Sequence, residues 1–388
     1  MKYPLFKVHV DVPAAMKNIQ EVLESGFINE GEQVTQLTNE MQRYFGTRRL
    51  ILTNSCTSAL TMALKLCGIK GNGEESVLST PMTCVATNCP IVTVGAHIQW
   101  VDINMTSGCM SPDDLRMKLK RDPYVKAVMC VAWAGIPPDL EQIREICNEY
   151  RVPLILDAAH AFDAKYGGRH LYEWADFTCY SFQAIKHFTT GDGGMLICAD
   201  EEPWRRAKKM KWFGIDRDGT KDEKGNWKGQ RWETDISEAG YKFAMNNISA
   251  ALGMSQIPHI PRIMNAHRDN AEVYDGLFCT TSNRFVVPLM RPTNSDPSYW
   301  VYSMFVYDTT LIDRDRLVKD LNDRGIGAGL VHIPNDIYEC FSFYKDNLPG
   351  VREFAQRQLS LPVGWWLKTE DLHHIYETVQ ELCLQQVE

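Results

Sequence analysis

The 388-residue sequence predicts an α/β fold, in which a large domain with a mixed, mostly parallel seven-stranded sheet precedes a smaller α+β C-terminal domain. Two observations lead to this prediction. Short runs that are apolar throughout alternate with helix-period segments between about residues 49 and 200, which is typical of a parallel sheet covered by helices on both faces. After about residue 285 the pattern changes to that of a smaller α+β unit. We place the two domains at 1–255 and 256–388.

The N-terminal residues are expected to be helical. Residues 13–45 have helical periodicity, with a break at the glycine-bounded segment 26–31. The alternating region then supplies the predicted strands, with helices between them, for example over 59–66 and 140–149. The predicted strands are 50–53, 77–79, 98–101, 127–132, 154–156, 177–180 and 195–198.

The C-terminal half returns to helix over about 245–276, where Pro258 and Pro261 must kink or interrupt the helix because proline lacks an amide hydrogen. Residues 299–307 alternate like a strand with two distinct faces, and a helix is expected over 311–324. A last helix is expected to begin near Thr369, a plausible N-cap. Its apolar face would consist of Leu372, Ile375, Val379 and Leu382.

Composition excludes several classes of protein. Hydrophobic residues make up 44% and charged residues 23%, an ordinary globular balance. The net charge is −8 and no basic stripe is visible, which argues against a nucleic-acid partner, and the basic run 205–211 is interpreted as a solvated helix face. No apolar stretch approaches the length of a membrane span, and we expect no secretory signal.

The 12 cysteines are scattered, without a Cys-x-x-Cys pair or a zinc-like spacing to histidine. Several lie within apolar runs, as small buried side chains do. This pattern predicts no metal site and favours a reducing compartment, so we expect a cytoplasmic protein.

Two segments carry the chemical signal. Lys186 stands just ahead of a glycine-rich turn, and Asp157 ends an apolar strand earlier in the chain. Pyridoxal phosphate (PLP) chemistry needs this pair: the lysine amine forms a Schiff base with the cofactor, and a carboxylate keeps the pyridine nitrogen protonated. The apolar neighbours Ile185 and Phe188 predict a partly desolvated lysine with a lowered pKa.

Other features near this pair are individually weak. The segment 55–60 opens a helix after the first strand, and it could bind a phosphate or simply contain an N-cap. His160 could pack against a cofactor ring or be a core histidine with satisfied hydrogen bonds. The polar, glycine-punctuated segment 216–235 is a long loop, either an element that contacts substrate or a surface insertion.

Five segments taken together resemble the DegT/DnrJ/EryC1/StrS family of PLP-dependent nucleotide-sugar aminotransferases, which have the fold-type I (aspartate aminotransferase) architecture. The resemblance covers nearly the whole chain in order, and it is most specific around Asp157 and Lys186. A lysine at position 186 favours transamination, because some members of the family are sugar dehydratases with histidine there. The matching segments are 26–34, 156–161, 181–186, 190–194 and 250–253.

The resemblance implies roles for individual residues. Lys186 would carry the cofactor and act as general acid and base, Asp157 would pair with the pyridine nitrogen, and His160 would lie against the ring. The phosphate-binding positions are occupied by Cys56, Thr57 and Ser181.

The sequence departs from the family pattern at two cofactor positions. Cys84 replaces the usual aromatic residue stacked on the cofactor ring, and Lys242 replaces an asparagine that reaches the phosphate in the partner subunit. Segments 212–217 and 332–336 are distinctive variants of the sugar-site regions. Arg217 could bind the diphosphate or the amino donor's carboxylate, or be a surface arginine. The expected substrate contacts are Asn29, Arg217 and His332.

The resemblance implies a homodimer whose active sites are built from both subunits. The implied reaction moves an amino group from L-glutamate to C4 of a keto-deoxy sugar nucleotide (an NDP-4-keto-6-deoxyhexose), for surface glycans such as lipopolysaccharide O-antigen. Four alternatives stay open: a 3-keto sugar with amination at C3, a fold-type I enzyme acting on amino acids, a PLP-binding regulator, and a member that has lost cofactor binding.

Overall fold

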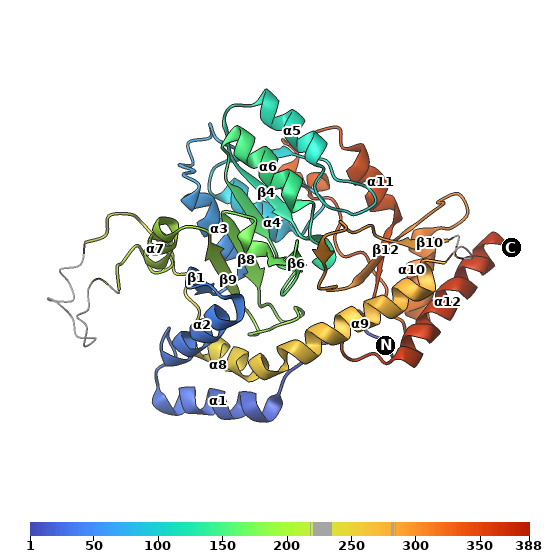
Figure 1. Cartoon of the computed structure of the whole chain (residues 1–388), viewed down its shortest axis with the longest axis horizontal. Helices are drawn as coiled ribbons and strands as arrows, with labels where there is room; N and C mark the ends of the chain where they lie inside the picture. Colours follow the sequence, from blue (N-terminus) through green and yellow to red (C-terminus); the bar gives the residue numbers. More distant parts are fainter. Residues whose placement is uncertain (218, 220–234, 281–282, 284) are drawn as a thin grey trace.

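The computed structural model describes residues 1–217, 219, 235–280, 283 and 285–388, and most of the predicted 216–235 loop therefore lies outside the described residues (Figure 1). Its central sheet confirms the predicted α/β class. The sheet has seven strands in the order β1-β9-β8-β5-β4-β2-β3. These strands are β1 (Leu50–Thr53), β2 (Ser76–Ser79), β3 (His97–Trp100), β4 (Val125–Val131), β5 (Leu154–Asp157), β8 (Phe177–Ser181) and β9 (Gly194–Cys198).

The five strands from β8 to β3 in this order are parallel, whereas β9 runs antiparallel to both β8 and β1. The carboxyl ends of β2, β4, β5 and β8 therefore meet at one edge. In a parallel sheet this edge is where ligands bind, because the loops that follow the strands converge there.

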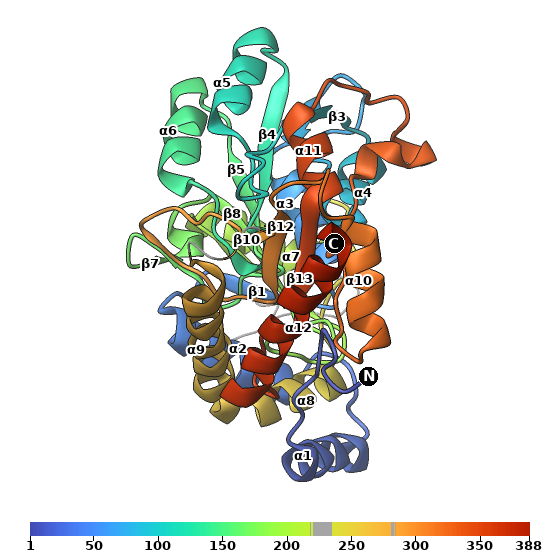
Figure 2. The ribbon, with the colours of Figure 1, turned by 90° about the vertical axis from the view of Figure 1, so that its right-hand side faces the viewer.

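Helices cover both faces of the sheet. Alternate residues of each strand face opposite cores: Leu50 and Leu52 join one apolar cluster and Ile51 the other. On the first face lie α2 (Glu32–Phe45), α5 (Pro112–Arg121) and α6 (Leu140–Tyr150). On the second lie α3 (Cys56–Leu66), α4 (Val85–Thr93) and α7 (Glu201–Met210). Figure 2 shows α6 and α4 on opposite sides of β4 and β5.

The predicted N-terminal helical region is confirmed as two helices. Helix α1 (Val12–Ser25) ends before the predicted break, and α2 begins at Glu32. Helix α1 packs along α8 (Asn247–Gln256), at the bottom of Figure 1.

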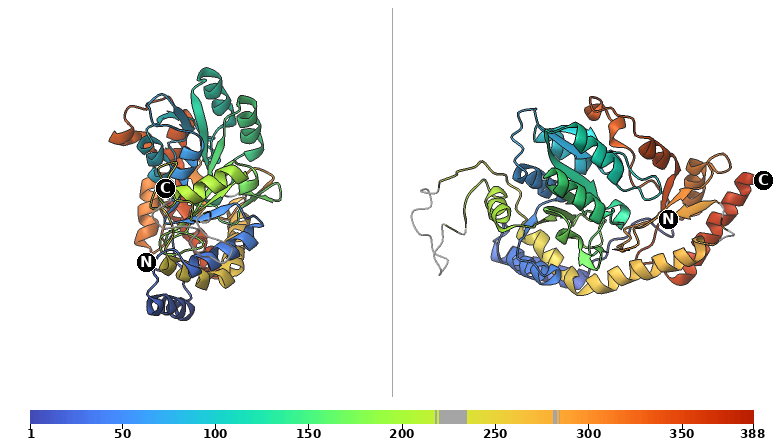
Figure 3. Two further views of the ribbon diagram at one scale, coloured as in Figure 1. Left: turned by 90° about the vertical axis from the view of Figure 1, so that its left-hand side faces the viewer. Right: turned by 45° about the horizontal axis from the view of Figure 1, so that its top comes forward.

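The predicted interruption near the two prolines is also confirmed. A 3-10 turn over Ile257–His259 separates α8 from α9 (Ile260–Phe278), and each proline stands in the first turn of its element. Proline costs least there, because the first amides of a helix have no partner within it. Helix α9 then runs from the α1–α8 pair to the C-terminal sheet (Figure 3).

The C-terminal part has a three-stranded antiparallel sheet, β10-β12-β13, which packs with helices around a third apolar core. In a separate small sheet, β6 (Lys165–Tyr166) pairs with β11 (Ser295–Asp296) on one side and with β7 (Arg169–His170) on the other. The remaining elements are β10 (Val286–Pro288), β12 (Tyr302–Val306), β13 (Gln358–Leu361), α10 (Arg314–Asp323), α11 (Pro349–Arg357) and α12 (Thr369–Val387).

Two details of the C-terminal prediction are wrong. The expected strand over 299–307 begins only at Tyr302, and all five residues of β12 are buried. Both faces are covered, because Tyr302 and Met304 face the third core while Phe305 packs against the large sheet's second core. The N-cap of α12 is Lys368, with Thr369 as the first helical residue. The expected apolar face of α12 is buried as predicted.

Within the described residues, no helix combines the length and apolar character that crossing a membrane requires. The same part of the chain contains no cluster of three or more histidine, cysteine or acidic side chains able to hold a metal ion.

Candidate active site

A cavity of about 280 Å³ opens at the carboxyl edge of the parallel strands. It is lined by Val131 at the end of β4, by residues from the segments that follow β1, β2, β5 and β8, and by two residues of the C-terminal part. Eight residues predicted from the sequence line it together: Cys56, Thr57, Cys84, Asp157, His160, Ser181, Lys186 and His332.

Lys186 lies in the segment after β8, where its backbone N–H donates to the carbonyl of Gln183. Its Nζ is 3.6 Å from the centroid of the Trp300 ring. Burial lowers the pKa of the amine to about 8, as its apolar setting predicts. Of the two predicted apolar neighbours, Phe188 is buried, whereas Ile185 lines the cavity and is 37% exposed. A lysine in this state has a substantial neutral fraction near neutral pH and can act as a nucleophile.

Asp157 is buried at the end of β5. One carboxylate oxygen accepts a 2.7 Å hydrogen bond from the Thr87 hydroxyl, and the other accepts from the Ala159 N–H at 3.0 Å. Burial raises the pKa of this carboxyl group, and the two hydrogen bonds oppose the rise. A buried carboxylate is stabilised by a cationic partner, which a protonated pyridine nitrogen provides.

His160 and His332 face each other, with their Nε2 atoms 3.3 Å apart. Burial lowers the pKa of both imidazoles, that of His332 to about 3, so both rings are neutral. The His160 ring also stacks on Trp300 at a centroid distance of 4.1 Å. Its buried Nδ1 has no hydrogen-bond partner among the described residues, which leaves a polar atom for a bound group to satisfy.

The start of α3 has the features of a phosphate site. Ser55 is the N-cap and its hydroxyl accepts from the Ser58 N–H, which leaves the first amides, those of Cys56 and Thr57, available to an anion. Gly194 lets β9 approach closely, since a Cβ there would lie 2.5 Å from the Cys56 nitrogen. A phosphate at α3, a ring nitrogen at Asp157 and an aldehyde at Lys186 correspond to the three parts of PLP, so the cavity fits this cofactor.

Two further side chains of this site were not predicted from the sequence. Thr87 belongs to the segment 81–87 that also contains Cys84, but no spacing rule indicates that its hydroxyl reaches Asp157. Trp300 comes from the loop before β12, more than a hundred residues after Lys186 in the chain. Only the packing of the C-terminal part against the large sheet brings it to the cavity.

Three predicted residues lie away from this cavity within one chain. Asn29 is exposed between α1 and α2. The guanidinium of Arg217 pairs with Glu30 at 2.9 Å, and Lys242 Nζ lies 3.6 Å from the centroid of the Trp212 ring. Glu30 and Arg217 line a second, open hollow of about 800 Å³ beside α7.

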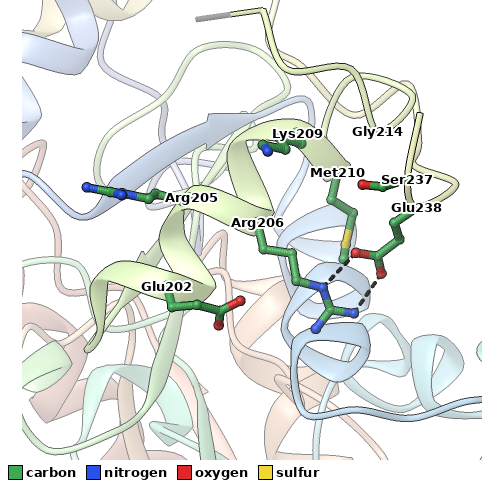
Figure 4. A pocket seen from close by; sticks show the side chains of 8 residues that line it. All are labelled: Glu202, Arg205, Arg206, Lys209, Met210, Gly214, Ser237 and Glu238. Atoms are coloured by element: carbon green, nitrogen blue, oxygen red, sulfur yellow. Dashed lines mark hydrogen bonds and ion pairs between the residues drawn. The ribbon is translucent and has the colours of Figure 1, made fainter. Parts of the chain in front are cut away.

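The basic run 205–211 is a solvated helix face only in part. Arg205 is exposed, but the half-buried Arg206 donates two hydrogen bonds, of 2.7 and 2.6 Å, to the carboxylate of Glu238 across a hollow of about 260 Å³ (Figure 4). Lys211 is largely buried in an ion pair with Glu30. The interpretation of the whole run as a solvated face is therefore wrong for these two residues.

Comparison with known proteins agrees with this geometry. The model of the DegT/DnrJ/EryC1/StrS aminotransferase family matches residues 11–380. The structure of AtS13 from Actinomadura melliaura is 33% identical, with a TM-score of 0.89 over 98% of each chain. The sugar aminotransferase CalS13 from Micromonospora echinospora is 31% identical, with a TM-score of 0.89 over 98% of this chain and 100% of that one.

A curated relative carries a more specific name. The UDP-4-amino-4,6-dideoxy-N-acetyl-beta-L-altrosamine transaminase of Campylobacter jejuni is 26% identical over 375 residues, which cover 95% of this chain and 93% of the relative. The match thus covers nearly the whole length of both proteins and includes the segments that build the cavity. The chain belongs to the DegT/DnrJ/EryC1/StrS aminotransferase family and is a PLP-dependent aminotransferase.

Proposed function

We propose that this aminotransferase moves an amino group from L-glutamate to the keto carbon of a keto-deoxy sugar nucleotide, at C4 of an NDP-4-keto-6-deoxyhexose. The observation that carries the proposal is that Lys186, Asp157 and His160 meet in one cavity beside the N-terminus of α3. The names of the similar proteins support a sugar substrate, and that of the Campylobacter relative supports a nucleotide-linked one. Amination at C3 of a 3-keto sugar is the second candidate.

Asp157, the first amides of α3 and Lys186 each have a defined task in this proposal. PLP, when bound, supplies a ring that accepts electrons from the carbon bearing the amino group. Asp157 holds the proton on the ring nitrogen, and the α3 amides bind the phosphate. Lys186 Nζ takes a proton from the substrate carbon and returns one to the cofactor carbon, because an amine with a pKa of about 8 can both accept and donate near neutral pH.

We also propose that the sites are shared between two copies of the chain. Lys242, Arg217 and Asn29 lie outside their own chain's cavity, as expected of residues that serve the partner's cofactor phosphate and substrate. A second copy would cover the apolar side chains that α1 and the following turn expose. These are Val12, Met16, Leu23, Phe27 and Ile28.

Two broader proposals follow. The 12 cysteines are free thiols, which suits a reducing compartment, and we therefore place the enzyme in the cytoplasm. There it would make amino sugars for surface glycans such as O-antigen.

We keep the domain boundary between residues 255 and 256. It lies close to the end of α8 and ahead of α9, the helix that leads into the third core.

The test is the visible absorbance of the PLP-loaded protein. We expect a band that L-glutamate bleaches and that the correct keto-sugar nucleotide restores, with the 4-keto compound more effective than the 3-keto compound. Borohydride reduction followed by peptide mapping should place the cofactor on Lys186, and the Lys186→Ala variant should show neither result. A band indifferent to glutamate would favour a fold-type I enzyme with other chemistry, and cofactor trapped on another lysine would overturn the site.

A further inference from the structure

The indole of Trp300 forms one wall of the cavity against the amine of Lys186. Trp300 is buried, and Lys186 Nζ lies 3.6 Å from the ring centroid, over its face. This is cation–π distance, at which the electron-rich face of an indole attracts an ammonium group. The same indole stacks on His160, so it contacts two residues assigned to the cofactor.

The indole is held from several directions. Its Nε1–H donates a 2.8 Å hydrogen bond to the carbonyl of Ile185, the residue before Lys186. Its backbone N–H donates to the carbonyl of Ala134. Phe6 of the N-terminal segment stacks on it at a centroid distance of 4.6 Å and an interplanar angle of 26°. The lysine segment and the indole are therefore fixed relative to each other.

The backbone around Trp300 is unusual. Tyr299 has a φ of 47°, a left-handed conformation that a bulky residue rarely adopts. Its carbonyl accepts a 2.7 Å hydrogen bond from His267 Nδ1. Gly135 approaches so closely that a Cβ on it would lie 2.7 Å from the Tyr299 nitrogen and 2.9 Å from that of Trp300. Strain of this kind persists where the surroundings over-determine a conformation, and it often marks functional sites.

We propose that Trp300 is a positioning residue for Lys186: its indole face holds the ε-amino group whenever that amine is not bonded to another group. The amine then stays at one place on the cavity wall through each turnover. This inference rests on the proposed role of Lys186 as the cofactor-bearing, proton-moving lysine.

Two effects of the indole on the amine oppose each other. Excluding water disfavours the ammonium form, and the π face favours it. A substitution that keeps apolar volume but removes the π face should therefore act differently from one that admits water. The other titratable groups that influence Lys186 or are influenced by it are Cys56, Cys84, Asp157, His160, His187 and His332.

The experiment uses cofactor-free protein, so it does not depend on catalysis. Acylation of Lys186 by acetic anhydride is followed against pH by peptide mass spectrometry. In Trp300→Leu we expect the pH midpoint of Lys186 acylation to fall by about one unit, as loss of a desolvated cation–π contact implies. Labelling at pH 7 should then rise several-fold. Trp300→Phe should stay near wild type, and Trp300→Ala, which admits water, should move the midpoint upward.

A structural role alone would give a different pattern. The matched control is Trp133→Leu, because the Trp133 ring lies edge-on to His332. In this variant the midpoint of Lys186 acylation should not move. If Trp300→Leu folds poorly, Trp300→Met provides the same removal of the π face. Equal midpoints in wild type and in a folded Leu or Met variant, or equal shifts in the Phe and Leu variants, would overturn the proposal. Borohydride trapping on Lys186 tests the proposed function separately, so the two can fail independently.

Discussion

The hydroxyl of Thr87 donates a 2.7 Å hydrogen bond to the buried carboxylate of Asp157. Thr87 has one hydroxyl hydrogen, so in its 2.9 Å contact with the Thr83 hydroxyl it must be the acceptor. A chain of donors thus runs from Thr83 through Thr87 to Asp157. It favours the ionised carboxylate, against the burial that raises the pKa of Asp157.

Removal of this bond should weaken PLP binding at its ring nitrogen. In Thr87→Val, Asp157 loses a donor that lowers its pKa, so the pKa rises further above its ordinary value. Ionised Asp157 is the form that pairs with a protonated pyridine, and PLP affinity should therefore fall by roughly tenfold at pH 7. The acid limb of PLP binding should also move to higher pH. Titration of PLP absorbance against pH measures both effects. Thr83→Val should have the smaller effect, because the Thr83 hydroxyl bonds to Thr87 and not to Asp157.

The lowered pKa of Lys186 predicts how fast the cofactor attaches. The neutral amine is the nucleophile, and its fraction rises as pH increases through the pKa. The rate at which cofactor-free protein captures PLP should therefore level off above a pH of about 8, instead of rising toward the ordinary lysine value of 10.5. Stopped-flow absorbance measures this rate, and free Nα-acetyl-lysine, which keeps its ε-amine, is the control. A midpoint near 10.5 would contradict the burial of this amine.

The proposed sharing of active sites predicts complementation between two inactive variants. In that arrangement Lys186→Ala removes the nucleophile of its own site, and Lys242→Ala removes a cation from the partner's site. In a mixed dimer both losses fall in one site and leave the other intact. Subunits that are unfolded and refolded together should therefore regain up to about half of the wild-type activity per mixed dimer, as the independence of separated sites implies. Mixtures that stay inactive would show that Lys242 acts in its own chain's site.

The close approach at Gly135 predicts a large loss of stability. Gly135 has a φ of 94°, and Gly135→Ala would press a Cβ against the backbone of Tyr299. We expect a fall in the free energy of unfolding of about 3 kcal/mol. The matched control is Gly276→Ala in α9, where a Cβ meets nothing within 4 Å, and which should stabilise the protein by about 0.5–1 kcal/mol. Thermal unfolding followed by circular dichroism separates the two.

The fold and the centre of the site were accessible from the sequence because their signals are local. Most strands of the large sheet are mainly apolar runs of four to seven residues, and such runs predict burial on both faces. The edge strand β3 is an exception, because its His97 is exposed and its Gln99 only half-buried. Asp157 ends β5 and Lys186 stands in the segment that follows β8, and parallel strands bring those ends to one edge.

Tertiary structure decided what touches these two residues. Thr87 reaches Asp157 and Trp300 reaches Lys186 across 70 and 114 positions of the chain, and no periodicity encodes a contact between loops at such separations. The segment of Trp300 even resembles the start of a continuous strand, because a two-residue pattern does not record the left-handed conformation of Tyr299, and the strand begins only at Tyr302. Sequence thus determined which elements form and which side chains carry the chemistry. The packing of the C-terminal part on the large sheet determined how the lysine is held, because a cavity wall is made by surfaces that meet only after folding.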